Sequence, residues 1–312
     1  MKPVLLLNAG VAFSATSPLH YTLGWDNKYA HTGHCKEHHY LHILESDDSH
    51  TKREFLNEKR QKANDKKPVI LGPDSEYVKF KGDYFFNPDN SIENYIKYYL
   101  EHYENIKDDY KAVADFSNSN AILSEEFMNS IKPKLLEHFD VKVIMVFRDP
   151  IRRLWSVSNV IVNNWKTLRK NKEKRKYANA NWDVQPENVT DYVKMCVGGK
   201  LEPNAYYHDI LRRHRNVWGK ENVHPIIMEE FWAGDTQPLE DFLDFPLPKI
   251  HENVYYPDMG SKAPHYDYLK DQWQSDTEDI TKEFYDYCLG KIQYIYNEFV
   301  WEYGRMPEAW MR

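Results

Sequence analysis

The sequence predicts an α/β fold in which a central parallel sheet is flanked by helices. One observation is the apolar, β-branched run at 141–147, which is typical of a strand buried on both faces. A second is that this run stops at 148–150 and is followed by apolar residues at helical spacing over 151–161. A third is the similar strand-like run at 4–7. A chain of 312 residues is long enough for one large α/β domain or two small ones. Because no linker divides the sequence cleanly, we predict a single domain over 1–312.

The segment that follows the run at 141–147 combines features of an anion site. Pro150 has no N–H and fits the first turn of a helix, with Asp149 as the predicted N-cap. Arg148 then lies at the carboxyl end of a strand, where open α/β sheets bind ligands, and its planar guanidinium suits phosphate oxygens. Ser156 follows about two helical turns into the helix. From the residues alone, a joint phosphate site and an ordinary ion pair beside an ordinary serine fit equally well.

The run at 148–156, RDPIRRLWS, resembles the 3′-phosphate-binding motif of sulfotransferases that use 3′-phosphoadenosine 5′-phosphosulfate (PAPS). In that family the first arginine and the serine bind the 3′-phosphate, and the resemblance gives these roles to Arg148 and Ser156. It implies a P-loop-like sulfotransferase fold, PAPS as co-substrate and a reaction that needs no metal. The resemblance covers most of the chain, and this motif is its most specific part.

The loop at 8–19, between the first predicted strand and a helix that continues from about His20, is rich in small residues. Such a loop can cradle a phosphate with backbone amides, although a plain turn explains it as well. It also resembles the 5′-phosphosulfate loop of sulfotransferases, Gly-x-x-Lys-x-Gly-Thr-Thr. On this resemblance the cofactor-binding residues of the loop are Gly10, Ser14, Ala15, Thr16 and Ser17.

The loop departs from the family pattern at two positions. Ala15 stands at the second glycine, and Phe13 stands at the lysine that contacts the phosphosulfate and stabilises charge on the leaving group. Three interpretations follow. The protein is a slow enzyme, or another cation such as Lys28 or Lys36 substitutes, or the protein binds PAPS, its product PAP or a glycan without catalysis.

Five histidines, Cys35 and Glu37 lie within the twelve residues of 31–42. Imidazole and thiolate are good zinc ligands, but the spacing fits no closed zinc motif. The part at 36–40, KEHHY, resembles the Lys-Glu-x-His-Phe segment of glycan sulfotransferases, in which the glutamate is the general base for the acceptor hydroxyl. The resemblance therefore implies Glu37 as the base, His39 as a neighbouring polar contact and a carbohydrate acceptor. A zinc-binding module and a solvated Glu–His cluster stay open.

The next segments predict further elements of the α/β fold. A helix is expected at 92–106 from its amphipathic pattern, and its stripe of tyrosines is interpreted as core. A short strand is expected at 112–116, and the polar run after it resembles a family segment near the cofactor, which implies that Asp115 and Ser117 lie there. Ser124 is the predicted N-cap of a helix that runs to about residue 139.

The last third of the chain follows the later half of the family. A helix is expected at 206–218, a strand at 223–228 and a long amphipathic helix at 277–303 with Gly290 in its middle. The loop at 259–265 resembles the family loop that closes over the cofactor, which implies that Lys262 contacts the 3′-phosphate or the adenosine. The basic run at 166–176 fits either steering of an anion or a solvated helix face.

Composition excludes some classes of function. The formal net charge of −7 argues against nucleic-acid binding driven by overall charge. Three widely spaced cysteines indicate no disulfide framework, and no apolar run is long enough to span a membrane, so we expect a cytoplasmic protein without membrane contact. A nucleotide or small-molecule kinase is the remaining enzyme class, and the absence of a Walker lysine after the first strand disfavours it.

Overall fold

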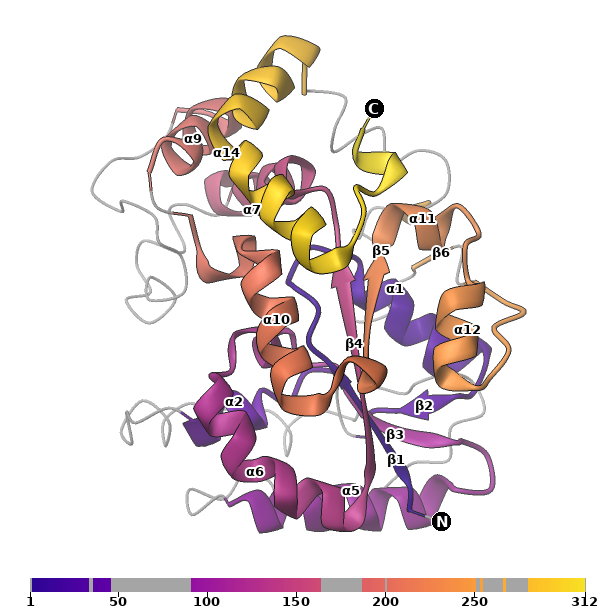
Figure 1. Cartoon of the computed structure of the whole chain (residues 1–312). Coiled ribbons are helices and arrows are strands. Elements are labelled where there is room, and N and C mark those ends of the chain that lie inside the picture. The colour runs from indigo at the N-terminus through magenta and orange to yellow at the C-terminus, as the bar shows by residue number, and fades with distance from the viewer. Residues whose placement is uncertain are drawn as a thin grey trace.

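The computed structural model describes residues 2–33, 36–45, 91–163, 187–199, 201–250, 253–254, 266–267 and 280–311. Five strands within these ranges form a parallel sheet in the order β2-β3-β1-β4-β5 (Figure 1). They are β1 (Val4–Asn8), β2 (Ala30–His31), β3 (Ala112–Asp115), β4 (Asp140–Phe147) and β5 (Val223–Ile227). A short antiparallel pair joins β6 (Asn253–Val254) to β7 (Tyr266–Asp267). The predicted central parallel sheet is confirmed.

Helices connect the strands and cover the sheet. The α-helices of the described ranges are α1 (Thr16–Tyr21), α2 (Tyr40–Glu45), α5 (Ile92–Ile106), α6 (Glu125–His138), α7 (Pro150–Asn163), α9 (Val189–Val197), α10 (Tyr207–Trp218), α11 (Met228–Trp232), α12 (Gln237–Leu243) and α14 (Lys282–Tyr303). A π-helical turn, η1 (Thr22–Asp26), extends α1, and short 3₁₀ turns are η2 (Asn118–Ile122), η4 (Pro203–Ala205), η5 (Lys220–Asn222) and η7 (Glu308–Trp310).

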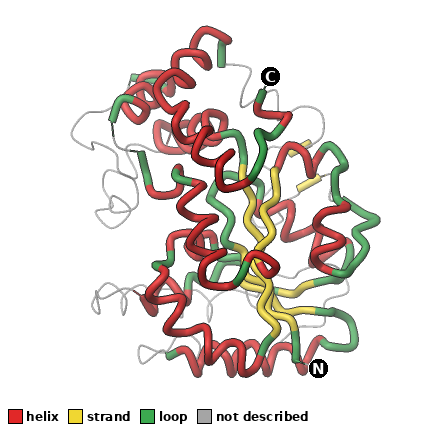
Figure 2. Tube along the Cα trace, viewed as in Figure 1, coloured by secondary structure: helices red, strands yellow, loops and turns green. Residues whose placement is uncertain are grey.

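The strand side chains alternate between two apolar cores, one on each face of the sheet. On one face, residues such as Leu5 and Val143 pack with α5, α6, α10 and α14. On the other, Leu6 and Ile144 pack with α1, α11 and α12. Figures 1 and 2 show these two helical layers on opposite sides of the strands. Because successive side chains of a strand point to opposite faces, strands buried on both faces need the near-continuous apolar run at 141–147. The prediction of helices around the sheet is confirmed.

Several predicted boundaries agree with local capping chemistry. The helix expected at 92–106 is α5, and two tyrosines of its stripe, Tyr95 and Tyr99, are fully buried. Ser124 caps α6, since its hydroxyl accepts the N–H of Phe127 at 3.1 Å. Such a side-chain cap satisfies one of the N–H groups that a helix leaves unpaired at its start.

Two helix starts were predicted wrongly. Helix α1 already begins at Thr16 rather than near His20, because the loop before it turns through left-handed backbone at Ala15. The last helix begins at Lys282 rather than at residue 277, since Thr281 caps it and its hydroxyl accepts the N–H of Phe284 at 3.2 Å. This helix is kinked at Ile292, two residues after the glycine that weakened the pattern.

His214 on α10 is a buried histidine that joins two elements of the fold. Its Nε2 lies 3.1 Å from the carbonyl oxygen of Asn120 on η2. Burial, with a smaller contribution from the charge of Arg213, lowers the pKa of His214 from 6.5 to about 3. The unfolded chain therefore binds a proton at this residue over a pH range in which the folded chain does not.

We expect this histidine to make the protein less stable in acid. The contribution is fully present above pH 6.5 and is lost as the pH falls toward 3, by up to about 1.4 kcal/mol per pH unit. Urea unfolding of the wild type and of His214→Gln at several pH values measures it. The wild-type free energy of unfolding should fall relative to that of the variant below pH 6.5. A constant difference between the two proteins would contradict the prediction.

Candidate functional site

The chain after β1 stays against β4, and this brings two loops together. The N–H groups of Ala9 and Val11 donate to the carbonyls of Ile144 and Val146 on β4, at 2.8 and 3.3 Å. Between them lies Gly10, where an added Cβ would be 2.6 Å from the nitrogen of Val146. Only glycine permits so close an approach of the two backbones. The loops after β1 and β4 therefore meet at the carboxyl edge of the sheet, the usual ligand site of open α/β folds.

Left-handed backbone shapes the loop between Gly10 and helix α1. Phe13 has φ 66° and Ala15 has φ 57°, a region that costs a residue with a Cβ roughly 1–2 kcal/mol. Ala15 is the position at which the sulfotransferase loop pattern carries its second glycine, and its conformation gives a physical reason for that preference. Between these two residues, the hydroxyl of Ser14 is fully buried and has no hydrogen-bond partner among the described residues.

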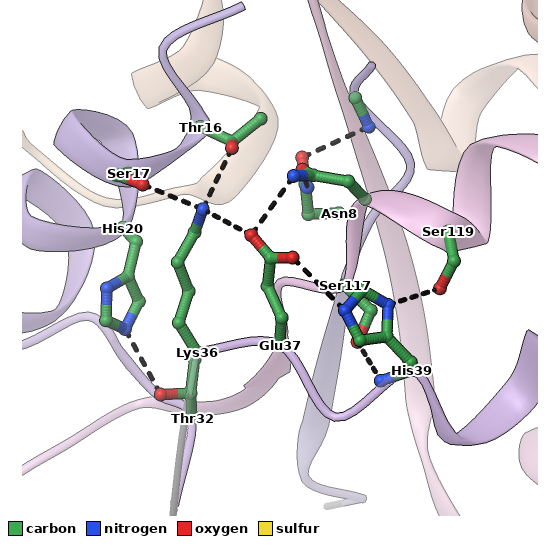
Figure 3. Close-up of polar contacts among 12 residues, drawn as sticks. Asn8, Thr16, Ser17, His20, Thr32, Lys36, Glu37, His39, Ser117 and Ser119 are labelled. Carbon is green, nitrogen blue, oxygen red and sulfur yellow. Dashed lines mark hydrogen bonds and ion pairs between the residues drawn. The ribbon is translucent and has the colours of Figure 1, made fainter. Parts of the chain in front are cut away.

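Lys36 places a cation on this loop from a distant part of the chain. Its Nζ donates to Thr16 Oγ1 at 3.0 Å, to Ser17 Oγ at 2.9 Å and to Glu37 Oε1 at 2.9 Å (Figure 3). Of the two lysines that the sequence offered as substitutes, Lys28 is exposed, and its ammonium makes no hydrogen bond or ion pair with the described residues. The structure therefore brings Lys36, and not Lys28, to the loop hydroxyls.

Glu37 lies at the centre of the polar cluster drawn in Figure 3. Besides Lys36, its carboxylate accepts a hydrogen bond from Asn118 Nδ2 at 3.0 Å, and its other oxygen lies 3.3 Å from His39 Nε2. Burial raises the pKa of Glu37, but the hydrogen bond of His39 and the charge and hydrogen bond of Lys36 outweigh burial and lower the pKa to about 2. The carboxylate is therefore ionised at neutral pH and weakly basic while Lys36 stays bound to it.

The turn after β3 holds His39 in place. The N–H of His39 donates to Ser117 Oγ at 2.8 Å, and its Nδ1 lies 2.9 Å from Ser119 Oγ. Ser117 is itself bound by the buried Asp115, whose Oδ1 accepts its N–H at 2.9 Å and its hydroxyl at 2.5 Å. Sequence reasoning placed Asp115 and Ser117 near the site but missed Asn118 and Ser119. The signal was present as the polar run directly after the strand.

Arg148 and Ser156 lie together beside the β1 loop. Arg148 Nη1 is 2.7 Å from Ser156 Oγ and 3.5 Å from the carbonyl oxygen of Phe13. The hydroxyl of Tyr207 holds the backbone of Arg148 by donating to its carbonyl at 3.0 Å. Only 7% of Arg148 is exposed, so its guanidinium is largely shielded from water. An anion bound beside it would therefore interact with its charge more strongly than in bulk water.

The residue after Arg148 anchors helix α7. Asp149 caps the helix by accepting the N–H of Arg152 at 2.9 Å, as the sequence predicts. Its other carboxylate oxygen accepts the hydroxyls of Tyr285 and Tyr296 on α14, at 2.7 and 3.1 Å, and its N–H donates to Glu229 Oε1 at 2.9 Å. Although burial raises its pKa, these donors satisfy the side chain. Asp149 thus joins α7, α11 and α14 behind the site.

A second buried group joins α7 to the β1 loop. Arg153 is 2% exposed, and its Nε donates to the carbonyl of Ala12 at 2.8 Å. Its Nη2 donates to Glu202 Oε1 at 2.5 Å. Arg153 therefore binds the carbonyl of Ala12, and Arg148 lies beside the next carbonyl, that of Phe13. These two contacts fix the position of the loop relative to α7.

Lys262, Cys35 and the basic run at 166–176 lie outside the described residues. In the ranges that the structure describes, no group of three or more His, Cys, Asp and Glu side chains is arranged to hold a metal ion. Nor does any described helix combine the length and the hydropathy that crossing a bilayer requires.

Comparisons with known proteins agree with this architecture. No family model matches the sequence, and no curated protein matches it. Among solved structures, a sulfotransferase from Alicyclobacillus acidocaldarius matches 100% of both chains with a TM-score of 0.53 and 15% sequence identity. The chain has the sulfotransferase fold. This likeness concerns the fold, since function depends on the residues of the site.

Two further solved structures are similar to the chain at lower TM-scores. The sulfotransferase domain of the Synechococcus PCC 7002 olefin synthase matches 94% of both chains, with 14% identity and a TM-score of 0.43. The sulfotransferase domain from the curacin biosynthetic pathway has 12% identity and a TM-score of 0.44, over 94% of this chain and 98% of that one. The assignment of the sulfotransferase fold rests on the first structure alone.

We expect Ala15→Gly to stabilise the protein by roughly 0.5–1 kcal/mol. Glycine relieves the left-handed strain at this residue, and the larger entropy that glycine loses on folding cancels part of the gain. The matched control is Ala12→Gly in the same loop, where φ is not left-handed and glycine should destabilise by about 0.5–1 kcal/mol. Thermal and urea unfolding measure both effects. Equal destabilisation by the two substitutions would show that no strain is present at Ala15.

Proposed function

We propose that this protein is a sulfotransferase that moves the sulfuryl group of PAPS to a hydroxyl or amine of an acceptor, which we take to be a carbohydrate. The observation that carries the proposal is the contact of Arg148 Nη1 with Ser156 Oγ, 2.7 Å long, beside the carbonyl of Phe13. This contact brings together the two residues that match the 3′-phosphate motif. The 3.5 Å contact of Arg148 with the carbonyl of Phe13 puts them beside the loop that resembles a 5′-phosphosulfate site.

The side chains present fit a nucleotide with phosphates at both ends. At one end, Arg148 and Ser156 would hold the 3′-phosphate, since a guanidinium binds phosphate oxygens with two donors at once. At the other end, the Gly10–Ser17 loop would hold the 5′-phosphosulfate with its backbone amides and hydroxyls. The buried hydroxyl of Ser14, which lacks a partner in the described ranges, supports a ligand at this loop. Lys262 is retained as a further contact to the 3′-phosphate or the adenosine.

The chain's own groups then perform three tasks. PAPS supplies an activated sulfuryl group on its 5′-phosphate. Glu37 accepts the proton of the acceptor hydroxyl as the acceptor oxygen bonds to sulfur and the bond from sulfur to the 5′-phosphate oxygen breaks. His39, held by Ser117 and Ser119, keeps the carboxylate of Glu37 in position. The donors of the loop stabilise the charge that develops on the departing PAP.

The acceptor and the extent of the domain belong to the same proposal. A carbohydrate is favoured because Glu37 and His39 stand in a segment that resembles glycan sulfotransferases. The net charge of −7 disfavours nucleic acid as the acceptor. We also propose that 1–312 form one domain, since the apolar core on one face of the sheet takes residues from Leu5 to Trp310.

A non-catalytic protein that binds PAPS, PAP or a glycan on the same fold is the second candidate. Phe13 at the position of the family lysine favours it, because a loop without that cation stabilises the leaving phosphate less. Turnover of PAPS with a panel of sugar acceptors separates the two candidates. Release of PAP that depends on an acceptor supports the enzyme, and tight PAP binding without any turnover supports the binding protein.

Arg148→Ala should weaken PAP binding by roughly 10- to 150-fold, because a hydrogen bond to a charged group contributes about 1.5–3 kcal/mol. Calorimetric titration with PAP measures this loss. Binding of adenosine 5′-phosphate, which has no 3′-phosphate, should change little. The control is Arg212→Ala, which removes an exposed arginine of α10. Unchanged PAP affinity in a folded Arg148→Ala protein would remove the 3′-phosphate site from the proposal.

Glu37→Gln should lower turnover by roughly 10²–10⁴ while PAP affinity is retained, since the amide keeps the shape of the side chain but cannot accept the proton. The measurement is initial-rate kinetics with saturating PAPS, together with PAP titration. Glu104→Gln, at an exposed glutamate of α5, is the control and should turn over like the wild type. A folded Glu37→Gln protein with wild-type turnover would show that another group is the base.

A further inference from the structure

The loop after β1 carries a hydrocarbon side chain where a sulfotransferase loop carries its lysine. Phe13 is 41% exposed and offers no charge to an anion. The other cations that contact the loop are engaged in different ways. Arg148 contacts Ser156 and the carbonyl of Phe13, and Arg153 is bound to Ala12 and Glu202. Neither of these contacts involves the hydroxyls at the start of α1.

Among the described residues, Lys36 is the cation that contacts both of those hydroxyls. Its ammonium lies 3.0 Å from Thr16 Oγ1 and 2.9 Å from Ser17 Oγ, the two residues that match the Thr-Thr pair of the loop pattern. Its side chain is 19% exposed, so it is partly desolvated but still reachable from solvent. Figure 3 shows the side chain extending from below toward these hydroxyls, with the carboxylate of Glu37 beside the ammonium.

We propose that Lys36 replaces the missing loop lysine, with its ammonium moving from the carboxylate of Glu37 to the 5′-phosphosulfate when PAPS binds. This proposal rests on the proposed function and deepens it. An ammonium has three rotatable donors on a flexible stem, so it can exchange one oxygen partner for another without movement of the backbone. In the bound state it stabilises the charge that develops on the departing 5′-phosphate.

The exchange has a consequence for the base. The positive charge of Lys36 and its hydrogen bond help to keep the pKa of Glu37 low. Glu37 loses both when the ammonium turns from its carboxylate to the phosphosulfate of PAPS. His39 and Asn118 remain bound to Glu37 and keep its position. The carboxylate of Glu37 thus becomes a stronger base only once PAPS is bound, so the acceptor hydroxyl is activated after PAPS has bound.

The test measures the contribution of the 5′-phosphate separately from that of the 3′-phosphate. Calorimetric titrations compare PAP with adenosine 3′-phosphate, which lacks the 5′-phosphate, and with adenosine 5′-phosphate, which lacks the 3′-phosphate. In Lys36→Ala, the preference for PAP over adenosine 3′-phosphate should fall by roughly 10- to 150-fold. The preference for PAP over adenosine 5′-phosphate should stay, because it depends on the 3′-phosphate, which Arg148 is proposed to bind. Lys36→Met, which keeps the length of the side chain, should behave in the same way.

Two further variants sharpen the result. Lys28→Ala, at the exposed lysine whose ammonium makes no hydrogen bond or ion pair with the described residues, is the matched control and should keep both preferences. Phe13→Lys in the Lys36→Ala background returns a cation to the family position and should restore the preference for PAP over adenosine 3′-phosphate. This rescue would not occur if Lys36 were needed only for folding.

The outcomes distinguish the inference from the function on which it rests. If folded Lys36→Ala and Lys36→Met proteins keep the full preference for PAP over adenosine 3′-phosphate, the inference is overturned. The proposed function then still stands on the preference for PAP over adenosine 5′-phosphate. If the wild-type protein binds none of the three nucleotides, the proposed function is overturned together with the inference.

Discussion

The parallel pairing of β1 with β4 is the constraint on which the rest of the site depends. The two strands pair in register from Val4 with Asp140 to Asn8 with Ile144, and the backbone contact continues past the strand to Val11. This close approach is possible only because Gly10 has no side chain. Since β2 and β3 lie on one side of β1 while β4 and β5 lie on the other, the loops after β1 and β4 open at the point where the strand order reverses. Ligands of open α/β sheets bind at such a point.

Behind that edge, buried polar groups make the scaffold rigid. The carboxylate of Asp149 accepts hydrogen bonds from two tyrosines of α14, and the guanidinium of Arg153 spans from Ala12 to Glu202. Arg153 and Glu202 form an ion pair, and removing one partner of a buried ion pair typically costs about 3–5 kcal/mol. The carboxylate of Asp149 is stabilised in its buried position by the hydroxyl groups that donate to it. The pair of Lys36 and Glu37 differs, because both side chains are partly exposed and the lysine has a flexible stem. The ion pair for which we propose an exchange of partner therefore lies on a scaffold of buried and fixed polar groups.

Sequence reasoning predicted the parts of the site that local patterns encode. The motif from Arg148 to Ser156 is one strand end followed by two helical turns, so its geometry follows from elements that form locally. The contact between its two side chains, 2.7 Å long, agrees with that expectation. The start of α1 was misplaced because left-handed backbone at Phe13 and Ala15 is not typical of either residue. Asn118 and Ser119 were missed because polar residues after a strand also form ordinary loops.

By itself, the sequence determined the fold class, because apolar periodicity and strand-to-helix turns are encoded over short stretches of chain. The roles of Arg148 and Ser156 came from the resemblance of the run at 148–156 to the sulfotransferase motif, and not from periodicity. The tertiary structure decided which charges meet. Nothing in the local sequence indicates that Lys36, rather than Lys28, contacts Thr16 and Ser17, or that Asn118 binds Glu37. These contacts join segments up to 81 residues apart. They exist because β1 and β3 pair side by side in the sheet, and the order of strands is a property of the whole fold.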